Sequence, residues 1–209
     1  MNEAAPQLPA VARQLAEILG PQRCVLVGAL AVAVHGYPRA TDDVDILTSL
    51  DLAEAQRMLR AEGIETVMRR GDVLEGDFPC LTGSLQGVRF DILPQLVTIQ
   101  WNHVVRVAVD GALLPIVDLE GLLRLKLRAA GPRDLLDAAQ LLLRHPDFIA
   151  GARELARAYR IEDKLEMWLR DPRGRSEAEE DLRSQGEDGR QALEKLRKLM
   201  PRRARKERR

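Results

Sequence analysis

Two aspartates placed two residues apart are the clearest candidates for chemistry in this sequence. Asp43 and Asp45 lie in the segment DVDIL, whose alternation of polar and apolar residues predicts a β-strand. Side chains two residues apart point to the same face of a strand, so both carboxylates face one way while Val44 and Ile46 face the core. Neighbouring carboxylates repel unless a cation neutralises them, and Mg²⁺ prefers one or two carboxylates together with waters and phosphate oxygens. The pair therefore predicts a divalent metal site.

A third aspartate has the same setting. In the segment VRFDIL, Asp91 alternates with the apolar residues Phe90 and Ile92, which predicts a second strand with a carboxylate on its polar face. If the two strands are neighbours, Asp91 lies close to the first pair. Three carboxylates can hold two metal ions about 4 Å apart, an arrangement that suits in-line phosphoryl transfer.

The segment before the aspartate pair could bind phosphate. Gly28 follows an apolar run and precedes a short predicted helix, so backbone N–H groups at the start of that helix could meet an anion. Glycine also lets a backbone approach a ligand closely. Arg39 and Thr41 could add a positive charge and a hydroxyl. A D-x-D pair alone usually lies in a solvated turn, but the apolar neighbours and this preceding turn favour a functional site.

The elements that must position these residues follow from hydrophobic periodicity. Residues 1–117 predict an α/β (α+β) core with a mixed sheet, whereas residues 118–170 predict a helical lobe. Residues 171–209 are interpreted as a polar linker or surface helix, then a last helix and a basic tail. In the core, helices are expected at 8–19, 29–36 and 51–62, and strands at 23–27, 43–47, 64–70, 80–92 (two strands joined at Gln86-Gly87), 103–109 and 112–116.

Composition bounds the class of protein. An apolar fraction of 45% over 209 residues is enough for a buried core, and an aromatic fraction of 3% argues against a module that stacks nucleic-acid bases. Cys24 and Cys80 lie in apolar stretches without metal-ligand spacing, which fits free thiols in a reducing cytoplasm. We see no signal peptide, and no apolar run long enough to span a membrane. We therefore expect a cytoplasmic protein without a membrane partner.

The net charge of zero conceals an acidic body and a basic end. Residues 194–209 hold nine lysines or arginines against two glutamates, a local balance of +7. This tail could bind RNA, including tRNA, through salt-sensitive phosphate contacts. It could equally be a disordered segment that only keeps the protein soluble.

Two ordered motifs carry a resemblance to a known family. The run GALAVAVHGYPRATDDVD, which starts at Gly28, resembles the signature of small prokaryotic nucleotidyltransferases of the DNA polymerase β-like superfamily. It is most similar to the branch that contains the abortive-infection type II (AbiEii-like) toxins, in which H-G precedes R-x-T-x-D-x-D. The later run DLEGLLRLKLRAAGPRDLLD, which ends at Asp137, is similar to the second signature of that branch. Together the two motifs cover roughly residues 8–145.

The resemblance implies a nucleotidyltransferase core and a helical lobe with a nucleoside triphosphate between them. It implies that Asp43 and Asp45 bind Mg²⁺ (or Mn²⁺), and that Asp91 is a third metal ligand or the base for the acceptor hydroxyl. Lys126 would approach the triphosphate, and a nearby carboxylate would fix Lys126 or the nucleotide. The further candidate nucleotide-binding residues are Gly28, Ala29, Arg39, Thr41, Asp134 and Asp137.

The reaction expected from this resemblance moves a nucleoside monophosphate from the triphosphate to a hydroxyl of RNA, a protein or a small molecule. The family commonly has Gly or Ser after the first glycine, but Ala29 has no hydroxyl and adopts a positive φ only at a cost. An alternative is therefore a catalytically impaired homologue that binds nucleotide or RNA or serves as a partner subunit. A third interpretation is a toxin that requires a cognate antitoxin.

Several of these residues also have purely structural interpretations. Lys126 could extend to solvent from the edge of an apolar helix, and Asp134 and Asp137 could be favourable acids near a helix start. We expect His35 to cap a helix or to act through its neighbours, and His103 to lie at the surface.

Overall fold

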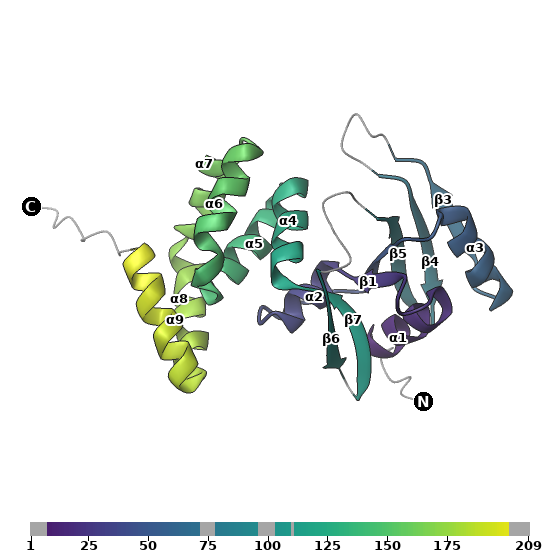
Figure 1. Ribbon diagram of the computed structural model, residues 1–209, viewed down its shortest axis with the longest axis horizontal. Coiled ribbons are helices and arrows are strands. Elements are labelled where there is room, and N and C mark those ends of the chain that lie inside the picture. Colours follow the sequence, from purple (N-terminus) through teal and green to yellow (C-terminus); the bar gives the residue numbers. More distant parts are fainter. Residues whose placement is uncertain (1–7, 72–77, 96–102, 110, 201–209) are drawn as a thin grey trace, which may run out of the picture. The chain divides into compact units, whose positions relative to one another are not determined.

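The computed structural model describes residues 8–71, 78–95, 103–109 and 111–200. The chain divides into two compact units, residues 1–125 and 126–209. Figure 1 shows that the first unit contains the sheet and that the second is helical. The division falls within helix α4 (Leu119–Ala129), after residue 125, whereas the boundary expected from the sequence followed residue 117.

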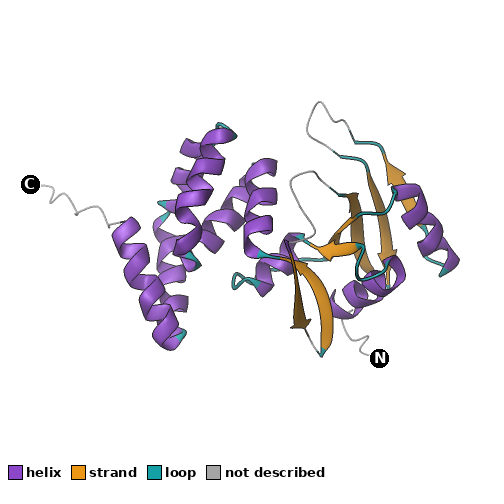
Figure 2. Ribbon diagram, viewed as in Figure 1, coloured by secondary structure: helices purple, strands orange, loops and turns teal. Residues whose placement is uncertain are grey.

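The first unit is built on a mixed sheet, as predicted (Figure 2). Within the described residues the sheet has seven strands in the order β3-β4-β5-β2-β1-β7-β6. Strands β2 and β5 are parallel, as are β1 and β7, and the remaining pairs are antiparallel. The strands are β1 (Cys24–Leu26), β2 (Asp43–Thr48), β3 (Thr66–Arg69), β4 (Cys80–Leu85), β5 (Val88–Pro94), β6 (Val104–Val109) and β7 (Ala112–Val117), and the helices α1 (Leu8–Leu19), α2 (Gly28–Val34) and α3 (Leu52–Ala61).

Strand β2 forms because its alternate residues are apolar. Val44 and Ile46 are fully buried, and Asp43 and Asp45, which alternate with them, are partly exposed, which confirms the predicted alternation. The strand leads into α3, whose N-cap is Asp51; its Oδ1 accepts a hydrogen bond from the Ala53 N–H at 2.8 Å. The start of α3 therefore fixes the end of the strand that carries the first two carboxylates.

The second unit consists of helices in its described part. They are the end of α4, then α5 (Pro132–Arg144), a 3₁₀ turn η3 (Pro146–Phe148), α6 (Ile149–Ala158), α7 (Glu162–Leu169), α8 (Pro172–Ser184) and α9 (Gly186–Leu199). None of the helices in the described ranges is long and apolar enough to cross a membrane. The last residues of the basic tail, 201–209, lie outside the described residues.

The sequence left two interpretations open for this polar segment, a linker or a surface helix, and the structure shows the helix α8. Asp171 caps this helix by accepting a hydrogen bond from the Gly174 N–H at 2.8 Å. Ala178 and Leu182 are fully buried on its inner face, which α5 contacts. Burial of those two side chains stabilises a helix whose mean hydropathy is otherwise low.

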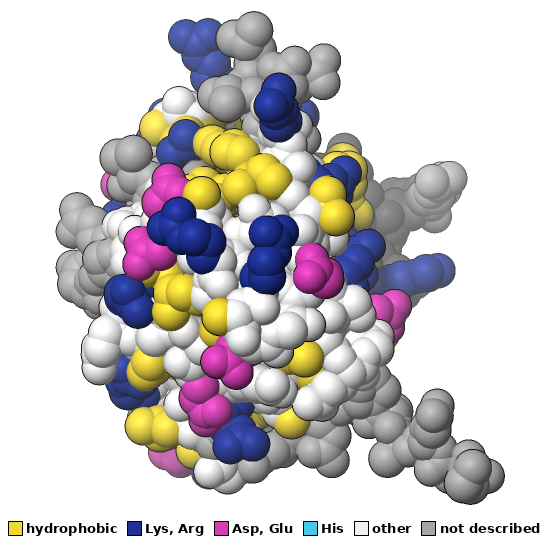
Figure 3. Space-filling model, turned by 90° about the vertical axis from the view of Figure 1, so that its right-hand side faces the viewer, with side chains coloured by type: hydrophobic (Ala, Val, Ile, Leu, Met, Phe, Trp, Pro, Cys, Tyr) yellow, Lys and Arg dark blue, Asp and Glu magenta, His cyan; other side chains and the backbone are white. Residues whose placement is uncertain are grey.

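The surface of the first unit mixes side-chain types. On the face shown in Figure 3, hydrophobic side chains gather near the top, with lysine and arginine around them and acidic side chains beside and below them. Val67 and Met68, on the edge strand β3, are among the exposed large hydrophobic residues. Apolar atoms make up a large part of any protein surface, so the exposure of these two residues alone marks no site.

The two free cysteines should differ in reactivity. Burial raises the pKa of the Cys24 thiol to about 11, whereas Cys80 is partly exposed. Because the thiolate is the reactive form, Ellman's reagent at mildly alkaline pH should modify Cys80 first and Cys24 much more slowly. In denaturant both thiols should react at similar rates, and Cys24→Ser should remove only the slow phase. Equal rates in the native protein would contradict this burial.

Candidate functional site

The parallel pairing of β2 and β5 brings the three predicted aspartates onto one face of the sheet. Asp45 is the register partner of Asp91, and Asp43 is the partner of Arg89. Partners on parallel strands project to the same face, and neighbouring strands lie about 4.8 Å apart. The carboxylates of Asp45 and Asp91 therefore lie side by side, and that of Asp43 lies one step along β2.

Two threonine hydroxyls orient the outer carboxylates. Thr41 Oγ1 donates a hydrogen bond to Asp43 Oδ1, and Thr82 Oγ1 donates one to Asp91 Oδ1, each at 2.7 Å. Thr41 was predicted to contact the nucleotide, and in the structure its hydroxyl is hydrogen-bonded to Asp43. Thr82 was not expected at the site at all. It lies on β4 as the register partner of Asp91, a relation that only the strand order reveals.

Arg89 places a positive charge among the acids. Its Nη2 donates to Asp43 Oδ2 at 2.8 Å. This hydrogen bond and the charge of Asp43 raise the pKa of Arg89, with smaller contributions from Asp91 and Asp45. The guanidinium thus lies in the field of all three carboxylates. Sequence reasoning missed Arg89, although its position two residues before Asp91 already placed it on the same face of β5.

Gly28 lies directly against Asp45. Its φ is +62°, and a Cβ built on Gly28 would lie 1.8 Å from Asp45 Oδ2. The backbone of the preceding residue fixes the same approach, because the Val27 N–H donates to the Asp45 carbonyl oxygen at 2.9 Å. The sequence suggested that glycine is needed here for contact with a phosphate. The structure adds a second reason, which is that any side chain would displace a site carboxylate.

Gly28→Ala should therefore affect ligand binding more than its backbone strain alone explains. Gly63→Ala is a matched control, because Gly63 has a similar φ of +74° but nothing within 4 Å of its added Cβ. Both variants should lose some stability, of the order of 1 kcal/mol, from the positive φ. Only Gly28→Ala should also weaken divalent-metal binding in a Mn²⁺ titration. Equal metal affinities in the two variants would contradict the contact with Asp45.

Two of the other candidates lie on helix α2 or shortly after it. Ala29 is buried in its first turn, and it is not among the described non-glycine residues with a positive φ. Alanine therefore causes no backbone strain at this position, and the remaining difference from the family is the missing hydroxyl. Arg39, beyond the end of α2, donates a long hydrogen bond of 3.4 Å to the carbonyl oxygen of Ala40.

Two histidines of the first unit make polar contacts between its secondary-structure elements. His35 is the C-cap of α2, and its Nε2 lies 2.8 Å from the carbonyl oxygen of Val117, which ties the helix to β7. The expected position of His35 at a helix cap is thus confirmed, whereas its side-chain contact is a long-range one. The surface position expected for His103 is wrong, because its side chain is only 16% exposed and its Nδ1 lies 3.0 Å from Asp118 Oδ2. Asp118 in turn accepts from the Gly121 N–H at 2.7 Å and caps α4.

Lys126 and its two predicted carboxylate partners form a cluster in the second unit. Lys126 Nζ lies 2.8 Å from Asp134 Oδ1 and 3.0 Å from Asp137 Oδ2. The side chains of Lys126 and Asp137 are 10% and 0% exposed, and that of Asp134 is 29% exposed. Lys126 therefore does not extend to solvent, and Asp137 is more than a favourable charge at a helix start. The cluster holds the ammonium group in a fixed position.

The acid face has the ligand chemistry that Mg²⁺ requires. It offers carboxylate oxygens from neighbouring strands on one partly exposed face, which suits a metal that keeps waters and phosphate oxygens as its other ligands. Within the described ranges, no three His, Cys, Asp or Glu side chains already converge as a metal-binding group. The hydrogen bonds of Asp43 and Asp91 described above each direct a carboxylate toward another protein group.

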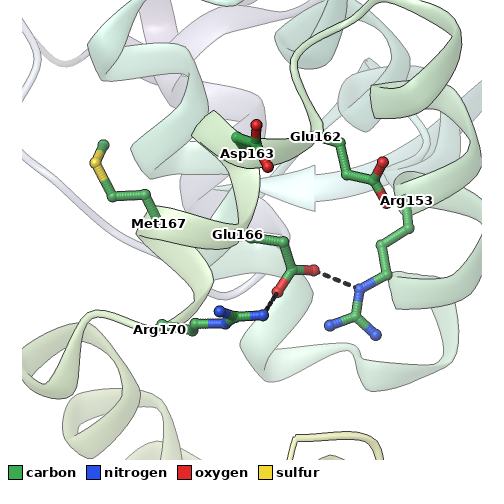
Figure 4. A pocket seen from close by; sticks show the side chains of 6 residues that line it. All are labelled: Arg153, Glu162, Asp163, Glu166, Met167 and Arg170. Carbon is green, nitrogen blue, oxygen red and sulfur yellow. Dashed lines mark hydrogen bonds and ion pairs between the residues drawn. The ribbon is translucent and has the colours of Figure 1, made fainter.

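The second unit also has an open hollow of about 580 Å³ (Figure 4), lined by Arg153, Glu162, Asp163, Glu166, Met167 and Arg170. Glu166 Oε1 accepts a hydrogen bond from Arg153 Nε at 2.6 Å. Its Oε2 lies 3.1 Å from Arg170 Nη2, as an ion pair that lacks hydrogen-bond geometry. Glu166 is thus paired with both arginines of the hollow, as in a surface ion-pair network, so the acid face remains the candidate site.

No family model and no curated protein matches this sequence. Among solved structures, ANT(2'')-Ia in complex with adenylyl-2''-tobramycin is 11% identical over 72% of this chain and 97% of its own, with a TM-score of 0.52. The solution structure of the same antibiotic-resistance factor is 10% identical over 72% and 92%, with a TM-score of 0.50. An antigenic nucleotidyltransferase-like protein from Paracoccidioides brasiliensis is 16% identical over 92% and 88%, with a TM-score of 0.42. The chain thus has the nucleotidyltransferase fold.

Proposed function

We propose that this chain is a metal-dependent nucleotidyltransferase that moves a nucleoside monophosphate from a nucleoside triphosphate to a hydroxyl. The observation that carries the proposal is the pairing of Asp45 with Asp91, with Asp43 on the same face, in a sheet of the nucleotidyltransferase fold. These are the positions at which the sequence motif predicted metal ligands.

In this proposal each residue has a definite role. Asp43 and Asp45 hold Mg²⁺ (or Mn²⁺), which when bound stabilises charge on the reacting phosphate. Asp91, oriented by Thr82, binds the metal or accepts the proton of the attacking hydroxyl. Catalysis then rests mainly on the positioning of the triphosphate and the acceptor. The candidate contacts to the nucleotide are the backbone at Gly28 and Ala29 together with Arg39, Thr41, Lys126, Asp134 and Asp137.

The nature of the acceptor is open to direct search. The structure of ANT(2'')-Ia contains an adenylylated small molecule, tobramycin, so small hydroxyl compounds belong in the search beside RNA and proteins. RNA binding through the basic tail stays a prediction, because residues 201–209 lie outside the described residues. An antitoxin partner also stays a prediction, which a small reading frame beside the gene would favour.

Transfer of a labelled nucleotide tests the proposal. The protein is incubated with Mg²⁺ and a triphosphate labelled at the α-phosphate, or in parallel at the γ-phosphate, together with pooled RNA, proteins and small hydroxyl compounds. We expect the α-label on an acceptor and the γ-label in pyrophosphate. A protein that transfers no α-label and binds no metal–nucleotide would contradict the proposal.

The second candidate is a catalytically impaired homologue that binds nucleotide. It is favoured by Ala29, which has no hydroxyl where the family commonly has Ser or Gly. In that case the protein binds metal and nucleotide but transfers no label. Ala29→Ser would then restore transfer without a large change in nucleotide affinity.

A further inference from the structure

Both oxygens of the Asp43 carboxylate have hydrogen-bond donors from the protein itself. Thr41 Oγ1 donates to Oδ1 and Arg89 Nη2 donates to Oδ2. Arg89 reaches Asp43 across the β2–β5 pair as its register partner. The bond between them is therefore a property of the sheet and does not depend on a loop.

This contact conflicts with the binding of a metal ion at Asp43. A divalent cation there would lie beside the guanidinium, so the two positive charges would repel, and one carboxylate oxygen cannot serve both equally well. Arg89 is free to move, because its side chain is 62% exposed, whereas Asp43 is only 27% exposed. We therefore expect Arg89, rather than Asp43, to move away when a metal ion binds.

A metal–nucleotide brings a new partner for the arginine to this same face. The triphosphate supplies oxygens that a planar guanidinium binds strongly, often with two parallel hydrogen bonds. Because Arg89 and Asp91 project from the same face of β5, the released guanidinium stays beside the acids. A phosphate that ligates the metal would therefore lie within its reach.

We propose that Arg89 exchanges partners during binding: it pairs with Asp43 before the metal binds and with a phosphate of the metal–nucleotide afterwards. This inference rests on the proposed function and adds a residue to its nucleotide-binding set. It makes the binding of metal and nucleotide cooperative, because the metal alone must displace Arg89 whereas the metal–nucleotide supplies it with a new partner.

Two titrations test the exchange on the full chain. Electron paramagnetic resonance measures the affinity for Mn²⁺ alone, and calorimetry measures the affinity for a non-hydrolysable triphosphate in saturating Mn²⁺. Relative to wild type, Arg89→Gln should bind Mn²⁺ alone about two- to fivefold more tightly, as expected for loss of an exposed ion pair. It should bind the nucleotide about tenfold more weakly, because a charged hydrogen-bond donor is lost. Arg89→Lys, which keeps the charge, should lie between.

The controls separate the possible outcomes. Arg57→Gln removes an exposed arginine of α3 and should change neither affinity by more than the change in net charge explains. If Arg89→Gln fails to tighten Mn²⁺ binding, or leaves nucleotide affinity unchanged, the proposed exchange of partners by Arg89 is wrong. If Asp45→Asn in the otherwise native chain leaves Mn²⁺ binding intact, the metal site itself is wrong and the proposed function fails with it. Thermal unfolding of Arg89→Gln confirms that the variant is folded.

Discussion

Replacing Asp45 with asparagine should lower the rate of nucleotide transfer about 10³-fold. Asp45 is the aspartate that lies against Gly28 and pairs in register with Asp91, so it is the central carboxylate of the face. A bound metal ion contributes several kcal/mol to a transition state, and about 1.36 kcal/mol corresponds to a factor of ten in rate. Asparagine keeps the shape of the side chain but lacks the negative charge that a divalent metal requires.

The neighbouring Asp42 offers a matched control for this experiment. It is exposed and lies just before β2, so Asp42→Asn makes the same chemical change outside the face. We expect Asp42→Asn to transfer label at nearly the wild-type rate, and Asp43→Asn to be impaired as Asp45→Asn is. Unchanged transfer in both Asp43→Asn and Asp45→Asn would show that the reaction takes place elsewhere.

Replacing Lys126 with methionine should lower the free energy of unfolding by about 3–5 kcal/mol. The ammonium group lies 3.0 Å from Asp137, whose side chain is 0% exposed, and 2.8 Å from Asp134. Methionine fills much of the same volume but removes the ammonium group that lies against the buried carboxylate. Urea unfolding of the two proteins, followed by circular dichroism, gives the difference.

Two further variants decide whether this loss comes from the buried charge. Lys164→Met makes the same substitution at an exposed position of α7 and should cost little. The double variant Lys126→Met, Asp137→Leu removes both charges and should recover part of the lost stability. If Lys126→Met is as stable as Lys164→Met, the cluster does not have the energetic role inferred here.

Period-two patterns in the sequence were sufficient to predict the strands of the site. The alternation in DVDIL placed Val44 and Ile46 in the core and the aspartates on the other face, and the structure confirms this arrangement. The same pattern in VRFDIL located β5. The sequence did not predict that β5 lies beside β2 with Asp45 opposite Asp91; it assumed that the two strands were neighbours. Strand pairing depends on long-range contacts that the local pattern does not encode.

The residues that sequence reasoning missed act across strands or helices. Arg89 and Thr82 enter the site only through register with Asp43 and Asp91. Helix α8 was only one of two interpretations of its segment, because its many charged residues also fit a linker. Its buried Glu179 reads as a solvated charge in the sequence, but Arg175 and Arg183 lie within 3.1 and 3.0 Å of that carboxylate. The i,i+4 spacing of these arginines can be read from the sequence, but the burial of Glu179 depends on helices packed against α8 and cannot.

A crystal structure with Mn²⁺ and a non-hydrolysable triphosphate is the most direct test of the central claim, because Mn²⁺ is located by its anomalous scattering. We expect a Mn²⁺ ion bound by Asp43 and Asp45, with phosphate oxygens completing its ligands. A nucleotide bound in the crystal with no Mn²⁺ at these two carboxylates would contradict the assignment of this face as the active site.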